Sequence, residues 1–190
     1  MINELAEKEL LEVIRRRCVL RGDFTLASGA KSNTYLDLRR ASCSWEAAEL
    51  IGDVLFDRLS EPPPDAVAGM ASGAIPLVTS TVLAARHFAA GYYDQPLEGL
   101  WVREAPKDHG SLSVVEGMFT PGDTVVLLED VATSGGSLLK AATVLRDMGL
   151  KVLAAIALVD RQQGANELLK EHDIDFQAVF TLAQVLEEEK

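Results

Sequence analysis

Cysteine, histidine and long apolar runs are all scarce in this chain of 190 residues. The two cysteines, Cys18 and Cys43, form no CxxC pair, and none of the three histidines lies at metal-ligand spacing from them. This scarcity argues against a disulfide framework and against a zinc site, and it indicates reduced thiols in a cytoplasmic protein. The longest apolar run, residues 152–159, is far too short to cross a membrane.

Basic residues are in the minority as well. The chain has 18 lysines and arginines against 29 aspartates and glutamates, which gives a net charge of -11 at pH 7. A chain this acidic repels nucleic acid and anionic membranes, so neither is an expected partner. Residues 1–13 are charged and amphipathic, unlike a secretion signal, and we expect a cytoplasmic protein.

Apolar segments alternate with helical patterns through most of the chain. Strands are expected at 66–70, 97–104, 123–130, 151–160 and near 176–180, with helices between them. This alternation predicts an α/β fold in which a parallel sheet is covered by helices on both faces. We expect one domain over 1–190, with its α/β core at 44–190.

Residues 1–43 do not fit the alternation. A helix is expected over 2–18, and two short strands are expected around a polar turn at 28–30. This segment, called the hood below, is predicted to cover one end of the sheet. Because ligands of open α/β sheets bind at the carboxyl ends of strands, we expect the loops after Met70, Glu104, Asp130 and Asp160 to surround one crevice.

The segment VVLLEDVATSGGSLLKAA (125–142) predicts a phosphate site. An apolar strand ends in Glu129 and Asp130, and a loop leads to a helix that Ser137 is expected to open. Glycines let backbone N–H groups approach an anion, and the helix N-terminus adds partial positive charge. The candidate phosphate ligands are Thr133, Ser134, Gly135, Gly136 and Ser137. An ordinary capped strand–turn–helix is the alternative, and the acidic pair argues against it.

The stretch EDVATSGGS resembles the phosphoribosyl pyrophosphate motif of type I phosphoribosyltransferases. FTLASGAKSNTYLDLR (24–39) is similar to the N-terminal signature of the orotate branch of that family. GMASGAIPL (69–77) resembles its pyrophosphate loop, REAPKDHG (103–110) its flexible catalytic loop, and VDRQQG (159–164) is a weaker match. The matches cover nearly the whole chain in the family's order, so the chain is identified as a member of the orotate phosphoribosyltransferases.

The resemblance implies a type I phosphoribosyltransferase fold and a reaction. The expected reaction moves the phosphoribosyl group from phosphoribosyl pyrophosphate to orotate, giving orotidine 5′-monophosphate and pyrophosphate in pyrimidine biosynthesis. Mg²⁺ is the implied cofactor, held mainly through substrate rather than by a metal site of the protein, and a homodimer is the implied assembly. The implied catalytic residues are Lys107, His109 and Asp130, and the implied substrate-binding residues are Arg103, Lys31, Ser72, Gly73, Glu129, Thr133, Ser134, Gly135, Gly136, Ser137 and Arg161.

The chemistry of these residues fits the implied roles. Cationic Arg103, Lys107 and His109 can stabilise a departing pyrophosphate, and the transition state is expected to resemble an oxocarbenium ion. Arg161 can bind the orotate carboxylate, although a surface arginine after a strand is the alternative. Two positions depart from the family pattern, because Ala27 and Glu104 stand where many members carry lysine.

Two other functions are compatible with the motifs. One is a phosphoribosyltransferase for another base, such as a purine, for which the phosphate loop would be unchanged. The other is a regulator that binds phosphoribosyl pyrophosphate without turnover. Such regulators usually carry a DNA-binding domain, for which this acidic chain has no room.

Overall fold

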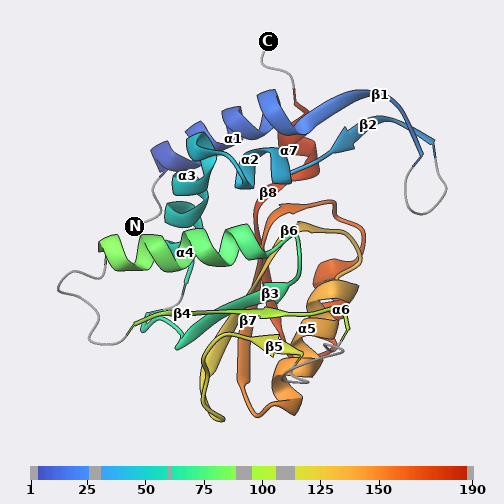
Figure 1. Ribbon diagram of the computed structural model, residues 1–190. Helices are drawn as coiled ribbons and strands as arrows, with labels where there is room; N and C mark the ends of the chain where they lie inside the picture. The colour runs from blue at the N-terminus through green and yellow to red at the C-terminus, as the bar shows by residue number, and fades with distance from the viewer. Residues whose placement is uncertain (1–3, 26–30, 60, 89–95, 106–113, 188–190) are drawn as a thin grey trace.

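A six-stranded sheet forms the centre of the computed structural model, which describes residues 4–25, 31–59, 61–88, 96–105 and 114–187 (Figure 1). Its strand order is β5-β4-β3-β6-β7-β8. The strands are β3 (Ala66–Met70), β4 (Glu98–Val102), β5 (Val115–Glu116), β6 (Thr124–Ala132), β7 (Lys151–Asp160) and β8 (Asp175–Thr181). Neighbouring strands are parallel except for β4 and β5, which are antiparallel. The predicted parallel sheet is therefore confirmed, with one short antiparallel strand that was not predicted.

The central strands are apolar because both faces of the sheet are covered. Within β6, Val126 and Leu128 belong to one buried cluster, whereas Val125 and Leu127 belong to another. A strand sends successive side chains to opposite faces, so a strand between two helical layers must be apolar at nearly every position. The continuous apolar runs of the sequence follow from this arrangement.

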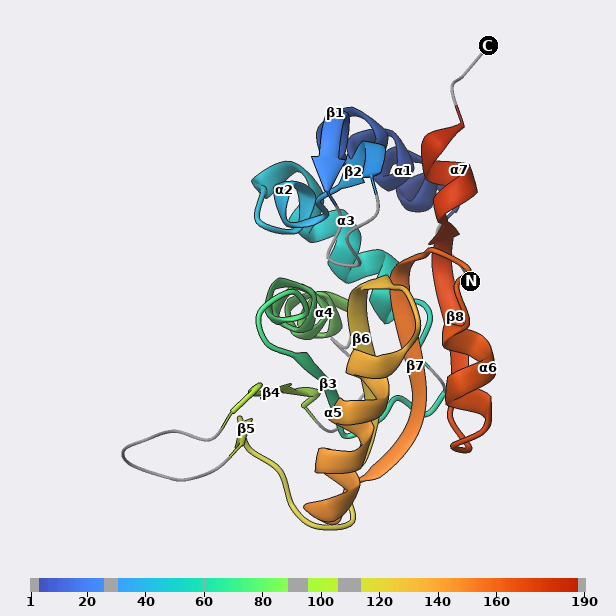
Figure 2. The same ribbon diagram turned by 90° about the vertical axis from the view of Figure 1, so that its right-hand side faces the viewer.

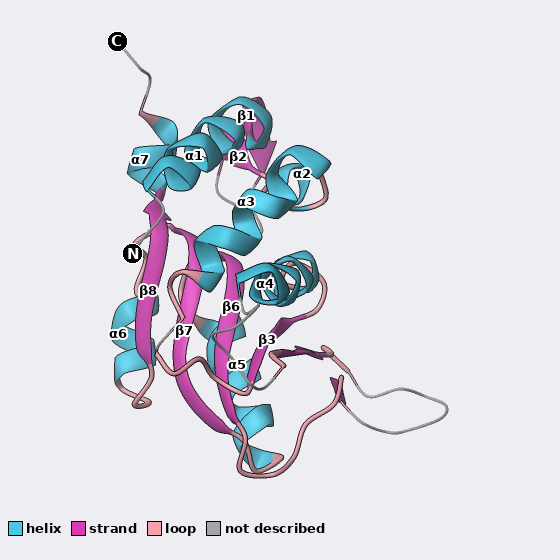
Figure 3. Ribbon diagram, turned by 90° about the vertical axis from the view of Figure 1, so that its left-hand side faces the viewer, coloured by secondary structure: helices cyan, strands magenta, loops and turns pink. Residues whose placement is uncertain are grey.

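Helices cover the two faces unequally. The helices α1 (Glu4–Cys18), α3 (Trp45–Phe56) and α4 (Ile75–Phe88) contribute to the cluster on one face (Figure 2). The helices α5 (Gly136–Asp147) and α6 (Ala165–Lys170) pack on the other face (Figure 3). Within the described ranges, no helix is long and apolar enough to cross a membrane.

The hood contains the predicted helix α1 and the two predicted strands. These strands, β1 (Val19–Thr25) and β2 (Lys31–Leu36), form an antiparallel hairpin that projects beyond the sheet (Figure 1). A short helix, α2 (Arg39–Ser42), follows the hairpin and was not predicted. At the other end of the chain, α7 (Leu182–Leu186) begins with a capping box formed by Thr181 and Gln184 and contacts α1.

Two helix starts differ in detail from the prediction. Ser44 is the N-cap residue of α3, as expected, but its hydroxyl donates to the carbonyl of Ala41 at 2.8 Å rather than capping the helix. The helix α5 begins at Gly136, and Gly135 in a left-handed conformation is its N-cap, so the prediction that Ser137 opens it was wrong by one residue. Glycine adopts this conformation without the steric cost that a Cβ imposes.

Candidate active site

A pocket of about 400 Å³ lies where the hood meets the carboxyl ends of three strands. Its lining residues come from the end of β2 and the turn after it (Thr34, Tyr35, Leu36, Asp37, Leu38 and Arg39), from the loop after β3 (Ser72 and Gly73), from β6 and its loop (Asp130, Val131 and Thr133) and from the loop after β7 (Arg161). Three of the four loops expected around one crevice therefore meet there. This pocket is called the base pocket below, after the nucleobase that the sequence resemblance predicts for Arg161.

The predicted phosphate-binding segment, residues 133–137, is called the phosphate loop; it lies beside the base pocket and surrounds a smaller cavity. That cavity, of about 90 Å³, is lined by Glu129, Val131, Ala132, Thr133, Ser134, Gly135, Gly136, Ser137 and Leu138. Among the described residues, no side chain caps α5 at its N-cap position. The first N–H groups of a helix have no partner within the helix and carry partial positive charge. An anion bound at this loop would satisfy them.

Gly135 is required at the head of the phosphate loop for two reasons. Its φ of 81° lies in the left-handed region. In addition, a Cβ on Gly135 would stand 3.1 Å from the Cα of Ala165, so α6 approaches the loop closely. Any side chain at position 135 would disturb both the turn and the packing of α6.

The two acidic residues of the motif occupy different surroundings. Glu129 is 8% exposed and lines the small cavity of the phosphate loop, whereas Asp130 lines the base pocket. Burial raises the pKa of Glu129 to about 8, and the negative charge of Asp130 adds to the effect. Asp130 Oδ1 accepts a hydrogen bond from the backbone N–H of Val131 at 2.8 Å. Glu129 therefore keeps its proton to a higher pH than an ordinary glutamate does.

The strand β6 continues past this pair. The sequence predicted that the strand ends at Asp130, but β6 extends to Ala132 and pairs with β7 there. The backbone N–H of Arg161 donates to the carbonyl of Ala132 at 2.9 Å. The loop that carries Arg161 is thereby fixed to the end of β6, and its side chain lines the base pocket.

Asp37 and Arg39 line the base pocket but were not predicted as site residues. Arg39 Nε donates to Asp37 Oδ1 at 3.0 Å. This hydrogen bond and the charge of Asp37 raise the pKa of Arg39, and Tyr35 and Asp130 contribute smaller effects of the same sign. The only sign of these residues in the sequence is that they fall in the segment YLDLR, directly after the second strand of the hood.

Two predicted site residues, Arg103 and Lys31, are not among the described residues that line either cavity. Arg103 Nη1 lies 3.6 Å from Glu116 Oε1, and its Nε donates to the carbonyl of Ala105 at 3.3 Å. Lys31 Nζ donates to Thr25 Oγ1 at 3.1 Å. Lys107 and His109 lie outside the described residues. The substrate-binding and catalytic roles of these four residues stay predictions.

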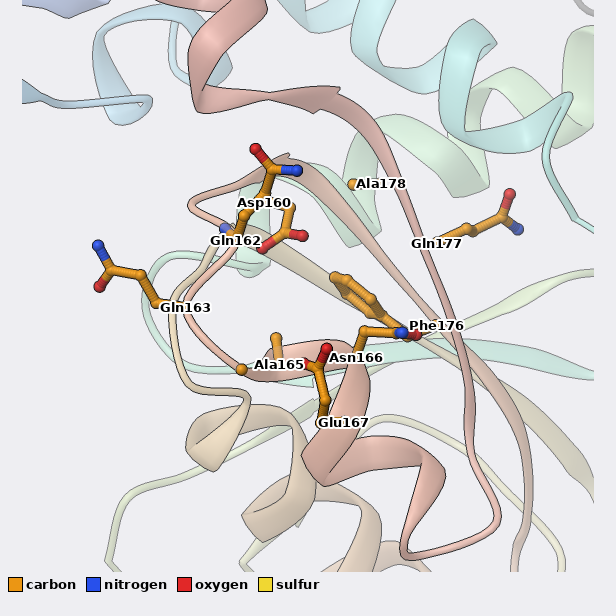
Figure 4. Close-up of a pocket in the computed structure, with 10 residues that line it drawn as sticks. Asp160, Gln162, Gln163, Ala165, Asn166, Glu167, Phe176, Gln177 and Ala178 are labelled. Carbon is orange, nitrogen blue, oxygen red and sulfur yellow. Dashed lines mark hydrogen bonds between the residues drawn. The ribbon is translucent and has the colours of Figure 1, made fainter.

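A further pocket, of about 520 Å³, lies between the loop after β7 and the edge strand β8 (Figure 4). Its described lining residues include two carboxylates, Asp160 and Glu167, and the amides of Gln162, Gln163, Asn166 and Gln177, but no basic side chain. The carboxylates of Asp160 and Glu167 would repel an anionic ligand and no described basic side chain offsets them, so this larger pocket does not suit phosphates or carboxylates. Asp160 Oδ1 accepts from the backbone N–H of Gln162 at 2.8 Å, which helps to fix the loop that carries Arg161.

The fold and the two cavities together define a class of protein. A parallel sheet under a hood, with an acidic pair followed by a glycine- and hydroxyl-rich loop at a helix N-terminus, is the arrangement of a phosphoribosyltransferase. In agreement with this, the family model of the phosphoribosyl transferase domain matches residues 45–183.

Individual relatives define the branch of this class. The orotate phosphoribosyltransferase of Rhodopirellula baltica is 40% identical over 179 residues, which cover 91% of this chain and 90% of that protein. A crystal structure of the Mycobacterium tuberculosis orotate phosphoribosyltransferase has a TM-score of 0.83 at 31% identity and covers 96% of this chain and 99% of its own. A second crystal structure of that enzyme, in complex with phosphoribosyl pyrophosphate, has a TM-score of 0.77 at 29% identity, with 95% and 98% covered. The chain belongs to the orotate phosphoribosyltransferase family.

Proposed function

We propose that this protein transfers the phosphoribosyl group from phosphoribosyl pyrophosphate to orotate, giving orotidine 5′-monophosphate and pyrophosphate in pyrimidine biosynthesis. The observation that carries the proposal is the convergence of Asp130 and Arg161 in the base pocket, next to the phosphate loop. The phosphate loop suits a phosphate, and Asp130 suits a sugar that develops positive charge. Arg161 suits a nucleobase that carries a carboxylate.

The 5′-phosphate is proposed to anchor the donor substrate in the site. The 5′-phosphate would bind at the start of α5, where Gly135 and Gly136 let backbone N–H groups approach it and Ser137 adds a hydroxyl. The crystal structure of the Mycobacterium tuberculosis relative with phosphoribosyl pyrophosphate supports this substrate. The proposal assigns phosphate binding to Thr133, Ser134, Gly135, Gly136 and Ser137.

Asp130 is proposed to act on the ribose. As the C1′–oxygen bond to pyrophosphate breaks, positive charge develops on the sugar ring. A fixed carboxylate facing the pocket stabilises that charge more in the transition state than in the ground state, which accelerates the reaction. Glu129, being buried and largely protonated at neutral pH, would bind a ribose hydroxyl through a hydrogen bond rather than through charge.

The leaving group and the base complete the proposed site. Arg103, Lys107 and His109 are proposed to stabilise the departing pyrophosphate, with Ser72 and Gly73 lining its side of the pocket. Lys31 is proposed to act as a further cation at the edge of the site. Arg161 is proposed to bind the orotate carboxylate with two parallel hydrogen bonds. A purine base has no carboxylate for Arg161 to bind, so the structure favours orotate as the acceptor.

Mg²⁺ is proposed as the cofactor, and the residues present fit a metal held mainly by substrate. Within the described ranges, no group of three or more histidine, cysteine, aspartate or glutamate residues could hold a metal ion. Asp130 offers one charged carboxylate, and Mg²⁺ commonly takes one or two carboxylates together with substrate oxygens and water. When bound, the metal would neutralise charge on the pyrophosphate. A homodimer and a cytoplasmic location stay predictions.

The test is a direct assay. Purified protein is mixed with Mg²⁺, phosphoribosyl pyrophosphate and orotate, and the loss of orotate absorbance is followed. The proposal predicts turnover with orotate and none with adenine, hypoxanthine or uracil. Turnover with a purine base and not with orotate would identify a different transferase, and tight binding of phosphoribosyl pyrophosphate without turnover of any base would identify a regulator.

A further inference from the structure

A second arginine, Arg39, lines the base pocket together with Arg161. The two residues reach the pocket from separate parts of the chain, because Arg39 begins α2 in the hood and Arg161 follows β7 in the core. Among the described residues that line the pocket, these two arginines are the cations and Asp37 and Asp130 are the anions. The two positive and two negative side chains balance, so local contacts with the arginines, rather than net charge, must hold a bound carboxylate.

The contact between Arg39 and Asp37 leaves part of the guanidinium for a ligand. Asp37 engages Nε at 3.0 Å. The two terminal nitrogens remain as a pair that can bind a carboxylate side by side. The side chain of Arg39 is 57% exposed and that of Asp37 is 22% exposed, so this ion pair contributes little to folding stability. In this contact the guanidinium of Arg39 is directed toward Asp37 at the pocket wall.

The next residue provides a natural comparison. Arg40 is also exposed and belongs to the same short helix, but it is not among the residues that line the base pocket. A general role of basic residues in this helix would apply equally to both arginines. Arg39 differs from Arg40 in lining the pocket and in its ion pair with Asp37.

We infer that Arg39 determines base specificity: it binds, together with Arg161, the carboxylate of the base, and Asp37 positions its guanidinium for this contact. Because the base is orotate, this role rests on the proposed function. The same contact is made to the nucleotide product, since orotidine 5′-monophosphate keeps the carboxylate. Uridine 5′-monophosphate lacks that carboxylate and is otherwise the same nucleotide, so comparing the two isolates the contact.

The experiment measures the affinity of wild-type protein and variants for these two nucleotides by titration calorimetry, alongside steady-state kinetics. Arg39→Ala should weaken binding of orotidine 5′-monophosphate by about tenfold or more, because it removes a charge-assisted hydrogen bond. Its affinity for uridine 5′-monophosphate should stay within about twofold of wild type, since a contact to the carboxylate is absent there. The KM for orotate should rise while the KM for phosphoribosyl pyrophosphate does not.

Three further variants complete the design. Arg40→Ala is the matched control and should behave as wild type. Arg39→Lys keeps the charge but loses the planar guanidinium with its paired N–H donors. It should therefore retain part of the preference for orotidine 5′-monophosphate over uridine 5′-monophosphate. Asp37→Asn should reduce discrimination less than Arg39→Ala does, because it disturbs only the positioning. Thermal melting of each variant checks that the fold is retained.

The outcomes separate this inference from the proposed function. Wild-type turnover of orotate, with Arg39→Ala binding both nucleotides as wild type does, overturns the role of Arg39 and leaves the proposed function intact. Equal weakening for both nucleotides also overturns it, because the carboxylate is then not what Arg39 binds. Wild-type protein that neither turns over orotate nor binds orotidine 5′-monophosphate overturns both.

Discussion

Gly73 lies directly against the carboxylate of Asp130: a Cβ built on Gly73 would stand 3.0 Å from both Oδ1 and Oδ2. The loop after β3 and the end of β6 therefore meet at van der Waals distance at the wall of the base pocket. No side chain fits at position 73 unless the carboxylate moves. The position of the Asp130 carboxylate thus depends on a residue that has no side chain.

Replacing Gly73 by alanine should therefore slow the reaction by displacing Asp130. We expect kcat for orotate to fall about tenfold, because small misplacements of a catalytic group are costly. The measurement is a double-mutant cycle with Asp130→Asn. If Gly73→Ala acts through the carboxylate, it should add little in the Asp130→Asn background. Full additivity of the two effects would assign Gly73 a separate role.

Asp130→Asn should itself reduce kcat by about 10²-fold or more, because it removes the charge that faces the ribose. Asp147→Asn is the matched control, since Asp147 is an exposed aspartate at the end of α5, away from both cavities. Single-turnover kinetics with orotate separate the chemical step from substrate binding. Near-normal kcat in Asp130→Asn would contradict the role proposed for this carboxylate.

Arg161→Ala should raise the KM for orotate much more than the KM for phosphoribosyl pyrophosphate. The reason is that Arg161 lines the base pocket and not the cavity of the phosphate loop. An Arg–carboxylate contact is bidentate and charge-assisted, and we expect its loss to cost at least about tenfold in orotate affinity. Equal increases in both KM values would mean that Arg161 does not bind the base carboxylate.

Glu129 should make folding stability fall as pH rises through the neutral range. Burial raises the pKa of Glu129 from its ordinary value of 4.5 to about 8 in the folded protein. Between these two values the folded chain keeps a proton that the unfolded chain has released. The free energy of unfolding contributed by this group is therefore fully present below the unfolded value and is lost as pH rises, with a slope of at most about 1.4 kcal/mol per pH unit.

The check is urea denaturation at a series of pH values, comparing wild type with Glu129→Gln. Glutamine is neutral at every pH, so the variant should lack this part of the slope. The difference in unfolding free energy between the two proteins should grow with pH, in favour of the variant. Parallel curves for the two proteins would show that Glu129 titrates at its ordinary value when folded.

The core could be predicted from the sequence because its signals are local. The apolar run of β6 and the glycine loop before α5 each carry their pattern within a few residues. By contrast, β5 has two residues and α2 has four, too few for any periodicity. Both are defined by tertiary neighbours, and β5 exists only through its pairing with β4.

The candidate site likewise contains residues that the sequence could predict and residues that depend on tertiary contacts. Gly73 and Arg161 follow strands and Asp130 lies near the end of one. Strand ends of a parallel sheet meet at one edge, so their convergence followed from the predicted fold. Asp37 and Arg39 could not be placed, because their contribution depends on how the hood sits over that edge. No local pattern records a contact between residues so far apart in the chain.

The family domain match begins at residue 45, whereas one wall of the base pocket is built from residues 34–39. The loop proposed to bind the donor phosphate thus lies inside the matched domain, and half of the residues that line the pocket proposed for the acceptor lie outside it. For protein engineering this separates two tasks along the chain. A library confined to codons 34–39 would vary half of the pocket proposed for the nucleobase while leaving the loop proposed for the phosphate of the activated sugar unchanged.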